Sequence, residues 1–292
     1  MCLNILFSEV PIRRWVTLQG KRNWVSSMLE INKIHQGDCL ELMKDIPDKS
    51  VDMILCDLPY GTTACEWDKV LPFDELWKQY KRILKEDGVV VLTASQPFTT
   101  DLINSNRNWF RYCWVWKKSR PSGFILAKKM PMKEHEDVLV FYNKSGRYFP
   151  QGLKKCKIDQ TRKASRNKGY TNIEDSGKKL IQEETGYPTS VLSFSSGHNS
   201  NTHPTQKPIS LFRYLIKTYT NEGDLVLDNC IGSGTTAVAC KQLNRRFIGI
   251  ELNPEYVDIC NKRLRQKTMF EIAEKRDTLN SYMDVSADSS QP

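Results

Sequence analysis

The 292-residue chain lacks the features that mark membrane proteins and proteins held together by disulfides or metals. No stretch approaches the roughly 20 consecutive apolar residues that a membrane-spanning helix needs. The nine cysteines are odd in number and no two are separated by just two residues, so we expect neither a disulfide framework nor a zinc knuckle. There is no internal repeat, and prolines number only 13. These absences predict a globular, cytoplasmic protein that needs no metal ion.

Acidic residues are in the minority. The chain has 34 Asp and Glu against 43 Lys and Arg, which gives a formal net charge of +9. Two stretches carry this excess: residues 111–133 hold seven basic side chains and no acid, and residues 146–202 hold ten basic and five acidic ones. A basic excess is typical of proteins with a polyanionic partner, but it also occurs in enzymes without one. Charge alone therefore leaves the partner open.

From residue 31 onward, short apolar segments alternate with longer amphipathic ones, which is the pattern of a parallel α/β sheet. We predict strands at residues 51–56, 88–94, 109–116, 136–142, 224–227 and 247–251. We predict helices at residues 73–84, 209–219 and 235–243. A last helix begins at Asn253 and Pro254, a capping residue followed by proline at the first helical position.

These patterns divide the chain into five parts. Residues 1–27 share no pattern with the rest and form an extension of unknown role, and residues 276–292 are expected to be a disordered tail. One α/β domain is expected to contain residues 28–145 and 203–275. The basic residues 146–202 between its halves lose the periodicity, which predicts an insert and not a second core.

A glycine-rich turn joins the strand at 224–227 to the helix at 235–243. Gly232 and Gly234 have no Cβ, so the backbone can turn sharply and let a ligand lie against its amides. Glu251, at the end of the next strand, can accept hydrogen bonds from both hydroxyls of a ribose. The pattern suits a dinucleotide such as NAD, and it could also be a tight strand-to-helix connection without a ligand.

Two neighbouring features favour a nucleoside that carries an amino acid. Asp228, just before the turn, would repel a pyrophosphate but could accept hydrogen bonds from an ammonium group, such as that of S-adenosylmethionine. The run His-Pro-Thr-Gln-Lys-Pro at 203–208 supplies the Thr205 hydroxyl and the Lys207 cation, which suit a carboxylate.

A second polar segment, Asp57-Leu58-Pro59-Tyr60, follows the strand at 51–56 and so lies at the carboxyl edge of the sheet. Pro59 stiffens this turn and restricts Leu58. The Asp57 carboxylate and the Leu58 carbonyl are two acceptors for the two hydrogens of an exocyclic amine. The Tyr60 ring offers a flat base a stacking surface.

Together these segments resemble the DNA amino methyltransferases, which transfer a methyl group from S-adenosylmethionine to adenine N6 or cytosine N4. Residues 57–60 resemble the family's Asp-Pro-Pro-Tyr motif, residues 228–235 its Asp-x-Phe-x-Gly-x-Gly loop, and residues 203–208 and 35–40 two accompanying segments. The base-handling motif precedes the cofactor loop, an order that defines the permuted beta class. The resemblance implies a Rossmann-like fold with a seven-stranded, mostly parallel sheet, one antiparallel strand and a small target-recognition insert.

The resemblance also implies a role for each motif residue. The catalytic turn would consist of Asp57, Leu58, Pro59 and Tyr60. The cofactor's adenine end would lie at Asp38 and Cys39, its ribose at Glu251, and its methionine end at Thr205, Lys207, Asp228, Gly232, Gly234 and Thr235. Asp38 could instead be a turn residue, and Lys207 a surface charge. Two positions depart from the family: Leu58 replaces a proline but keeps its carbonyl, and Cys230 replaces a phenylalanine that packs near the cofactor.

The basic run at 111–133 comes soon after the base-binding edge in the chain. We expect its members Lys117, Lys118, Arg120, Lys128 and Lys129 to contact DNA phosphates, although such a run can also be a solvated face. The aromatic residues at 109–116 have strand spacing and are expected in the core of the sheet.

We therefore predict a bacterial or phage DNA methyltransferase that acts on N6 of a flipped-out adenine, because aspartate and not serine opens its motif. Cytosine N4 is the alternative target. An NAD-dependent oxidoreductase and a DNA-binding protein without catalysis are more distant alternatives. Besides DNA, a second copy of the chain and a cognate restriction enzyme are candidate partners.

Overall fold

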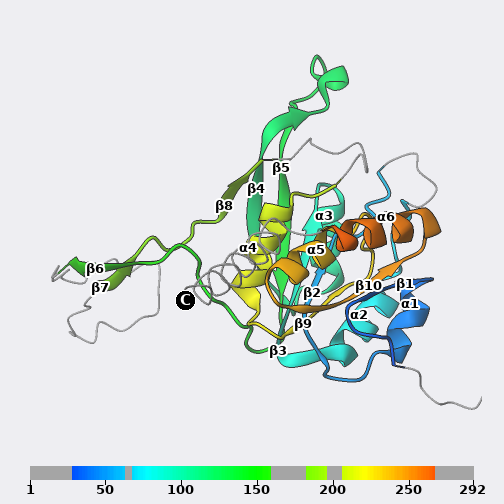
Figure 1. Ribbon diagram of the computed structural model, residues 1–292. Helices are drawn as coiled ribbons and strands as arrows, with labels where there is room; N and C mark the ends of the chain where they lie inside the picture. The colour runs from blue at the N-terminus through cyan, green and yellow to red at the C-terminus, as the bar shows by residue number, and fades with distance from the viewer. Residues whose placement is uncertain (1–27, 63–67, 159–181, 196–205, 267–292) are drawn as a thin grey trace, which may run out of the picture.

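The computed structural model describes residues 28–62, 68–158, 182–195 and 206–266 (Figure 1). The extension at 1–27, the tail at 276–292, Thr205 and much of the predicted insert lie outside these residues. The described residues form a central sheet with helices on both faces, and two thinner parts extend from this body (Figure 1). No helix in the described part of the chain is long and apolar enough to cross a bilayer.

Eight described strands make up the central sheet, in the order β1-β10-β9-β2-β3-β5-β4-β8. Their bounds are β1 Lys33–Gln36, β2 Val51–Cys56, β3 Leu84–Ala94, β4 Phe110–Ser122, β5 Lys133–Phe141, β8 Val191–Phe194, β9 Leu225–Asp228 and β10 Arg246–Glu251. Among them only β5 is antiparallel to its neighbours. The prediction of one antiparallel strand in a mostly parallel sheet is confirmed.

The predicted count of seven strands is too low by one. The additional strand, β8, pairs in parallel with the outer edge of β4, where Trp116 lies opposite Leu192. The Trp116 indole also donates to the Phe194 carbonyl at 3.0 Å. Because β8 falls within residues 146–202, the range predicted as an insert contributes an edge strand to the main sheet.

Helices cover the two faces of the sheet in two groups. Helices α1 (Cys39–Leu42), α2 (Phe73–Ile83) and α3 (Phe98–Ser105) pack on one face, and α4 (Ile209–Tyr219), α5 (Thr235–Gln242) and α6 (Pro254–Arg265) on the other. All six residues of β2 are buried, and its side chains alternate, so that Ile54 faces the first group and Met53 the second. The buried faces of α2 and α4 follow helical spacing.

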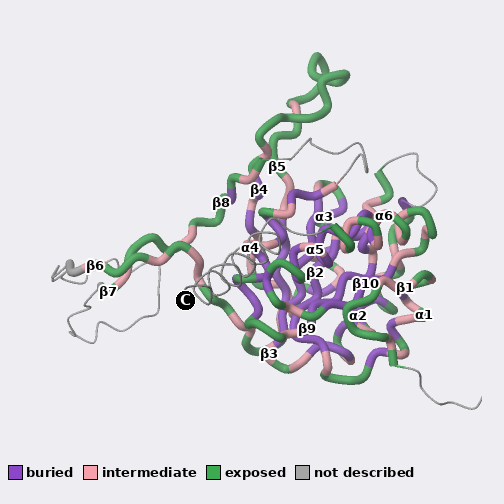
Figure 2. Tube along the Cα trace, in the orientation of Figure 1, coloured by how far each residue is buried: buried purple, intermediate pink, exposed green. Residues whose placement is uncertain are grey.

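Two parts extend from this body and are mostly exposed (Figure 2). Strands β4 and β5 continue past the sheet as a hairpin whose tip carries a short 3-10 turn, η2 (Phe124–Leu126). Strands β6 (Lys154–Ile158) and β7 (Gln182–Thr185) form a separate two-stranded antiparallel arm. Between the body and this arm, Arg147 is bound to Asp52, Asp87 and Asp224 near the starts of the parallel strands. Arg147, counted above in the basic excess of 146–202, is therefore neutralised inside the body.

Candidate active site

The predicted site residues gather at the carboxyl edge of the parallel strands. Asp57 follows β2, Asp228 ends the neighbouring β9, and Glu251 ends β10 beyond it. The antiparallel β5 begins near this same edge, which adds Glu136 to the group. Because parallel strands end together, segments far apart in sequence meet here.

Two hydroxyls hold the Asp57 carboxylate. The Tyr60 hydroxyl donates to Asp57 Oδ1 at 2.8 Å, and the Thr93 hydroxyl of β3 donates to the same oxygen. Phe98 stacks against the Tyr60 ring, with centroids 5.0 Å apart and planes 23° apart. Burial, together with the charges of Asp57 and Glu136, raises the pKa of Tyr60, so the phenol stays protonated and can donate.

The turn that carries Asp57 is fixed from both sides. The Asp68 carboxylate accepts hydrogen bonds from the backbone of Gly61 at 2.8 Å and of Thr62 at 2.9 Å. On the other side, the Leu58 side chain is buried in the core. The motif that this turn resembles has a proline in place of Leu58. Here, core packing of the Leu58 side chain restrains the turn instead. Within the described residues no donor is recorded on the Leu58 carbonyl.

Lys207 lies between two carboxylates of this group. Its Nζ is 2.8 Å from Asp57 Oδ2 and 3.2 Å from Glu136 Oε2, and its side chain is only 9% exposed. Burial by itself lowers the pKa of Lys207, but the charges of Asp57 and Glu136 outweigh it and raise that pKa. Lys207 is therefore a buried, charged partner of Asp57 and Glu136 and not a surface lysine. The Thr235 hydroxyl, at the start of α5, donates to its carbonyl at 3.4 Å.

The glycine loop has the backbone that its residues were expected to allow. Gly232 and Gly234 have φ angles of 54° and 85°, in the left-handed region that favours glycine. A Cβ on Gly234 would meet the Cys260 Sγ at 2.8 Å, whereas one on Gly232 would meet nothing within 4 Å. Gly234 is needed for packing against α6, and Gly232 leaves open space beside the loop.

Glu251 ties this loop to the end of β10. Its Oε2 accepts from the Gly232 amide at 2.8 Å and its Oε1 from the Asn253 amide at 2.9 Å. Burial raises its pKa, and these backbone hydrogen bonds oppose that shift. The Leu252 backbone also hydrogen-bonds this carboxylate, so among the described residues about one of its four lone pairs is left for a further donor.

Asp228 is only 3% exposed. It accepts from the Cys230 amide at 3.2 Å and from the Thr236 hydroxyl. Burial raises the pKa of Asp228 to about 7. Through these two hydrogen bonds the buried Asp228 holds the two ends of the glycine loop in place.

Asp38 caps α1 by accepting from the amides of Leu40 at 2.7 Å and Glu41 at 3.3 Å, which is the turn role weighed for it above. Cys39 is buried, and the Asn229 amide links its Sγ, at 3.6 Å, with that of Cys230, at 3.5 Å. The departure at Cys230 therefore fills the core beneath the loop. Burial raises the pKa of Cys56 to about 12, as expected of a thiol that serves as core.

The structure divides the five predicted DNA-contacting residues into two groups. Lys117 pairs with Glu134 at 3.6 Å, and Lys118 with Glu136 at 2.5 Å, so acids of the neighbouring strand neutralise them. Arg120, Lys128 and Lys129 are exposed near the hairpin tip. Of the aromatic residues at 109–116, Trp114 and Trp116 are buried as expected, and the others are only partly buried.

Four residues of the site were missed from the sequence. Thr93, a hydroxyl in an apolar run, and Glu136, an acid at the start of a strand, carried a weak signal. Phe98 and Asp68 carried none, because only the folded chain brings them to Tyr60 and Gly61.

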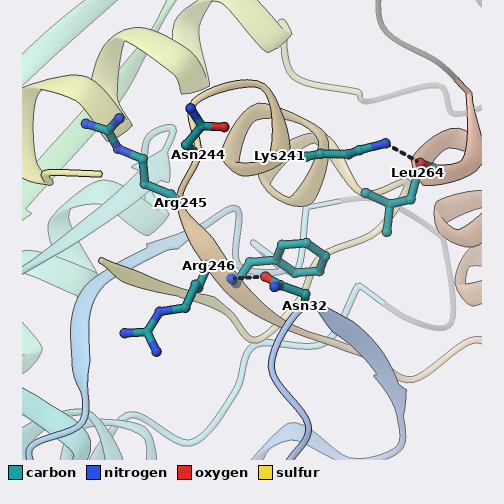
Figure 3. A pocket seen from close by; sticks show the side chains of 7 residues that line it. Asn32, Lys241, Asn244, Arg245, Arg246 and Leu264 are labelled. Atoms are coloured by element: carbon teal, nitrogen blue, oxygen red, sulfur yellow. Dashed lines mark hydrogen bonds between the residues drawn. The ribbon is translucent and has the colours of Figure 1, made fainter. Parts of the chain in front are cut away.

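A hollow at the opposite edge of the sheet is not part of this site (Figure 3). It is lined by Asn32, Lys241, Asn244, Arg245, Arg246, Phe247 and Leu264. Lys241 donates to the Leu264 carbonyl and Arg246 to the Gly223 carbonyl, and Arg245 is likewise bonded to backbone carbonyls. These cations therefore already have partners within the protein. The hollow lies where β10 begins, whereas the glycine loop lies near the end of β10.

The fold and the two motifs at one sheet edge define a class I methyltransferase, and comparison with known proteins agrees. A family model described as DNA methylase matches residues 51–262. The type II methyltransferase M1.MboII of Moraxella bovis is 29% identical over 260 residues, 82% of this chain and 98% of that relative. M.BglII of Bacillus subtilis is 32% identical over 258 residues, 78% of this chain and 68% of that relative.

A crystal structure of an M1.HpyAVI–SAM complex aligns with a TM-score of 0.55 at 26% identity, over 79% of this chain and 98% of that one. The chain belongs to the DNA methylase family. The prediction of a beta-class DNA amino methyltransferase that uses S-adenosylmethionine and acts on DNA is confirmed. The NAD-dependent oxidoreductase is thereby set aside.

Proposed function

We propose that the chain methylates the N6 amino group of an adenine that has been flipped out of DNA. The observation that carries the proposal is the environment of Asp57. An ionised carboxylate offers about four lone pairs. Tyr60 and Thr93 use two on Oδ1, and Lys207 uses one on Oδ2. Among the described residues one acceptor position is left on Oδ2, and the carbonyl of the next residue, Leu58, has no donor.

These two acceptors match the two hydrogens of an exocyclic amine. The lone pair of such an amine is delocalised into the ring, which makes it a poor nucleophile. Hydrogen bonds to Asp57 and to the Leu58 carbonyl favour a pyramidal nitrogen, and the carboxylate stabilises the positive charge that develops on it. S-adenosylmethionine supplies an electrophilic methyl group on its sulfonium when bound. No covalent enzyme intermediate is needed, which agrees with the buried thiols.

The residues present fit that cofactor. Gly232 leaves open space at the loop, and the Glu251 carboxylate has a lone pair for a ribose hydroxyl. Asp228 would accept from the ammonium group once ionised. Asp38 and Cys39, after the neighbouring β1, are proposed for the adenine end.

The target base is proposed to stack on Tyr60. Phe98 stacks on that ring and the Lys207 Nζ lies 5.6 Å from its centroid, so a flat base would use the area of the ring that these two leave. Aspartate as the first motif residue supports adenine over cytosine. We propose that target recognition belongs to residues 146–202, part of which forms the β6–β7 arm, and that the enzyme works in the bacterial cytoplasm, where its DNA lies.

The product of the reaction tests the proposal. The protein is incubated with S-adenosylmethionine carrying a labelled methyl group and with mixed-sequence DNA, and the DNA is digested to nucleosides. Label in N6-methyladenine is expected. Label in N4-methylcytosine would select the alternative target, and no label in any DNA would contradict methylation of either base.

A further inference from the structure

The tip of the β4–β5 hairpin exposes apolar side chains that the function above does not use. Phe124 is 79% exposed, Ile125 97% and Leu126 45%, and Met130 nearby is 51% exposed. The turn is nevertheless ordered by backbone hydrogen bonds: the amide of Leu126 donates to Gly123 at 2.9 Å, and that of Met130 to Leu126 at 3.0 Å. Consecutive apolar residues held in the open at the end of a hairpin mark an interaction site.

Positive charge surrounds this apolar tip. Arg120, Lys128, Lys129 and Lys133 are exposed on the same hairpin, and within the described residues no acid is recorded as an ion-pair partner of any of them. Closer to the body the charges are neutralised, because Glu134 and Glu136 pair with Lys117 and Lys118. Beyond Lys118, the cations of the hairpin have no acidic partner among the described residues. A second copy of the chain would bring these cations against one another, whereas a polyanion complements them.

The tip also lies on the same side of the molecule as the site. Strand β4 runs in the same direction as β2 and β3. Its end at Ser122 therefore projects past the carboxyl edge of the sheet, which carries Asp57. Its Trp116 lies opposite Glu136, which contacts Lys207. The six steps from Trp116 to Ser122 span roughly 20 Å at the rise of a strand. The protein can therefore hold a flipped base at Asp57 and touch the duplex with the hairpin tip at the same time.

We propose that Phe124, Ile125 and Leu126 form a wedge that enters the base stack of the DNA substrate, while the four tip cations hold the flanking phosphates. This inference rests on the proposed function. Apolar side chains inserted between base pairs unstack them, and a ring can stack on any base, so the wedge would act without reading sequence. Its task is to make the target base easier to flip and to fill the gap left behind.

Two duplexes of identical sequence test the wedge, once product analysis has located the methylated position. In one the target base is normally paired, and in the other it faces an abasic position, where flipping breaks no pair. A double variant, Phe124→Ser with Ile125→Ser, should slow methylation of the paired duplex by about tenfold or more, and that of the abasic duplex much less. These side chains are exposed, so thermal unfolding should not change.

The matched control is Lys128→Ala with Lys129→Ala. It should weaken binding to both duplexes by the same factor and reduce the dependence of binding on salt. An equal loss on both duplexes in the serine variant, or no loss, would overturn the wedge. A change in sedimentation without a difference between the duplexes would instead assign the tip to contact between copies, and would also overturn it.

A binding measurement separates this inference from the proposed function. The probe is a duplex with 2-aminopurine, whose fluorescence rises when it is unstacked, in mixed flanking sequence. Wild-type protein should raise the signal and the serine variant should not. If no DNA is methylated but this difference appears, the wedge holds and the function fails. If DNA is methylated and both proteins give the same signal, the function holds and the wedge fails.

Discussion

Strand β2 carries one carboxylate near each end, and the two have opposite surroundings. Asp52 is fully buried, and Lys85 at 2.7 Å, Arg147 at 3.1 Å and the Leu225 amide at 2.9 Å occupy its oxygens. Asp57 has a side chain that is 27% exposed, and among the described residues one acceptor position on it is left unused. Both carboxylates are held by cations and hydrogen bonds. Only Asp57 combines solvent access with an unused acceptor position, which is what the proposed catalytic role requires.

Asp57→Ala should have the largest effect on catalysis. We expect the rate of methyl transfer to fall about a thousandfold, because the acceptor that stabilises the developing charge is lost. S-adenosylmethionine binding should remain measurable by calorimetry, and the free energy of unfolding should change less than in an Asp52 variant. Near-normal transfer would remove Asp57 from its role.

Asp52→Asn should show the reverse pattern. It removes the charged partner of Lys85 and one of the three aspartates that bind Arg147. We expect the free energy of unfolding in urea to fall by about 2 kcal/mol. Methyl transfer per folded molecule should stay within about threefold of wild type. A large loss of transfer without a loss of stability would mean that the two ends of β2 are not separate in function.

Asp228→Asn tests whether the ionised, buried Asp228 carboxylate destabilises the folded protein. The folded pKa of Asp228, about 7, is raised by burial above the ordinary value of 3.8. Between these values the folded state holds a proton that the unfolded chain has released, so wild-type stability should fall as pH rises. From about pH 4 to 8 the variant should gain roughly 4 kcal/mol relative to wild type in urea unfolding. A constant difference would show that Asp228 titrates normally.

Lys207→Met should have the smallest effect and decides between two roles. The resemblance places Lys207 at the methionine end of the cofactor, whereas the structure pairs it with Asp57 and Glu136. If the second role dominates, kcat should fall about tenfold while KM for S-adenosylmethionine stays nearly constant. A rise in KM at constant kcat would favour the first. Lys217→Met, an exposed position on α4, is the matched control and should change neither.

The sequence predicts this architecture best where local pattern decides it. The predicted bounds of β2 and α4 match the structure, because a fully buried strand and an amphipathic helix each leave a continuous pattern. β8 was missed because four residues at a sheet edge have no pattern of their own and depend on pairing with β4. The motif positions were found from their resemblance.

The electrostatics of the site could not be predicted in the same way. Lys207 and Asp57 are 150 residues apart in sequence, and no residue near Lys207 in the sequence indicates that the two pair. The run at 111–133 contains no acid, yet Glu134 and Glu136 neutralise part of it across the hairpin. Charge read along residues 111–133 therefore overstated the basic surface of this hairpin, because acids on β5 neutralise two of its lysines.

The Arg147 anchor fixes the point at which the chain leaves the body. The chain departs just after Arg147, which is tied to three aspartates at the far edge, and returns through β8, which is paired to β4 on the side of the sheet that carries Glu136. The point of departure lies away from Asp57, so changes in the β6–β7 arm should leave the contacts of Asp57 unaltered. If residues 146–202 recognise the target, as proposed, the recognised sequence can change in evolution while the chemistry stays constant.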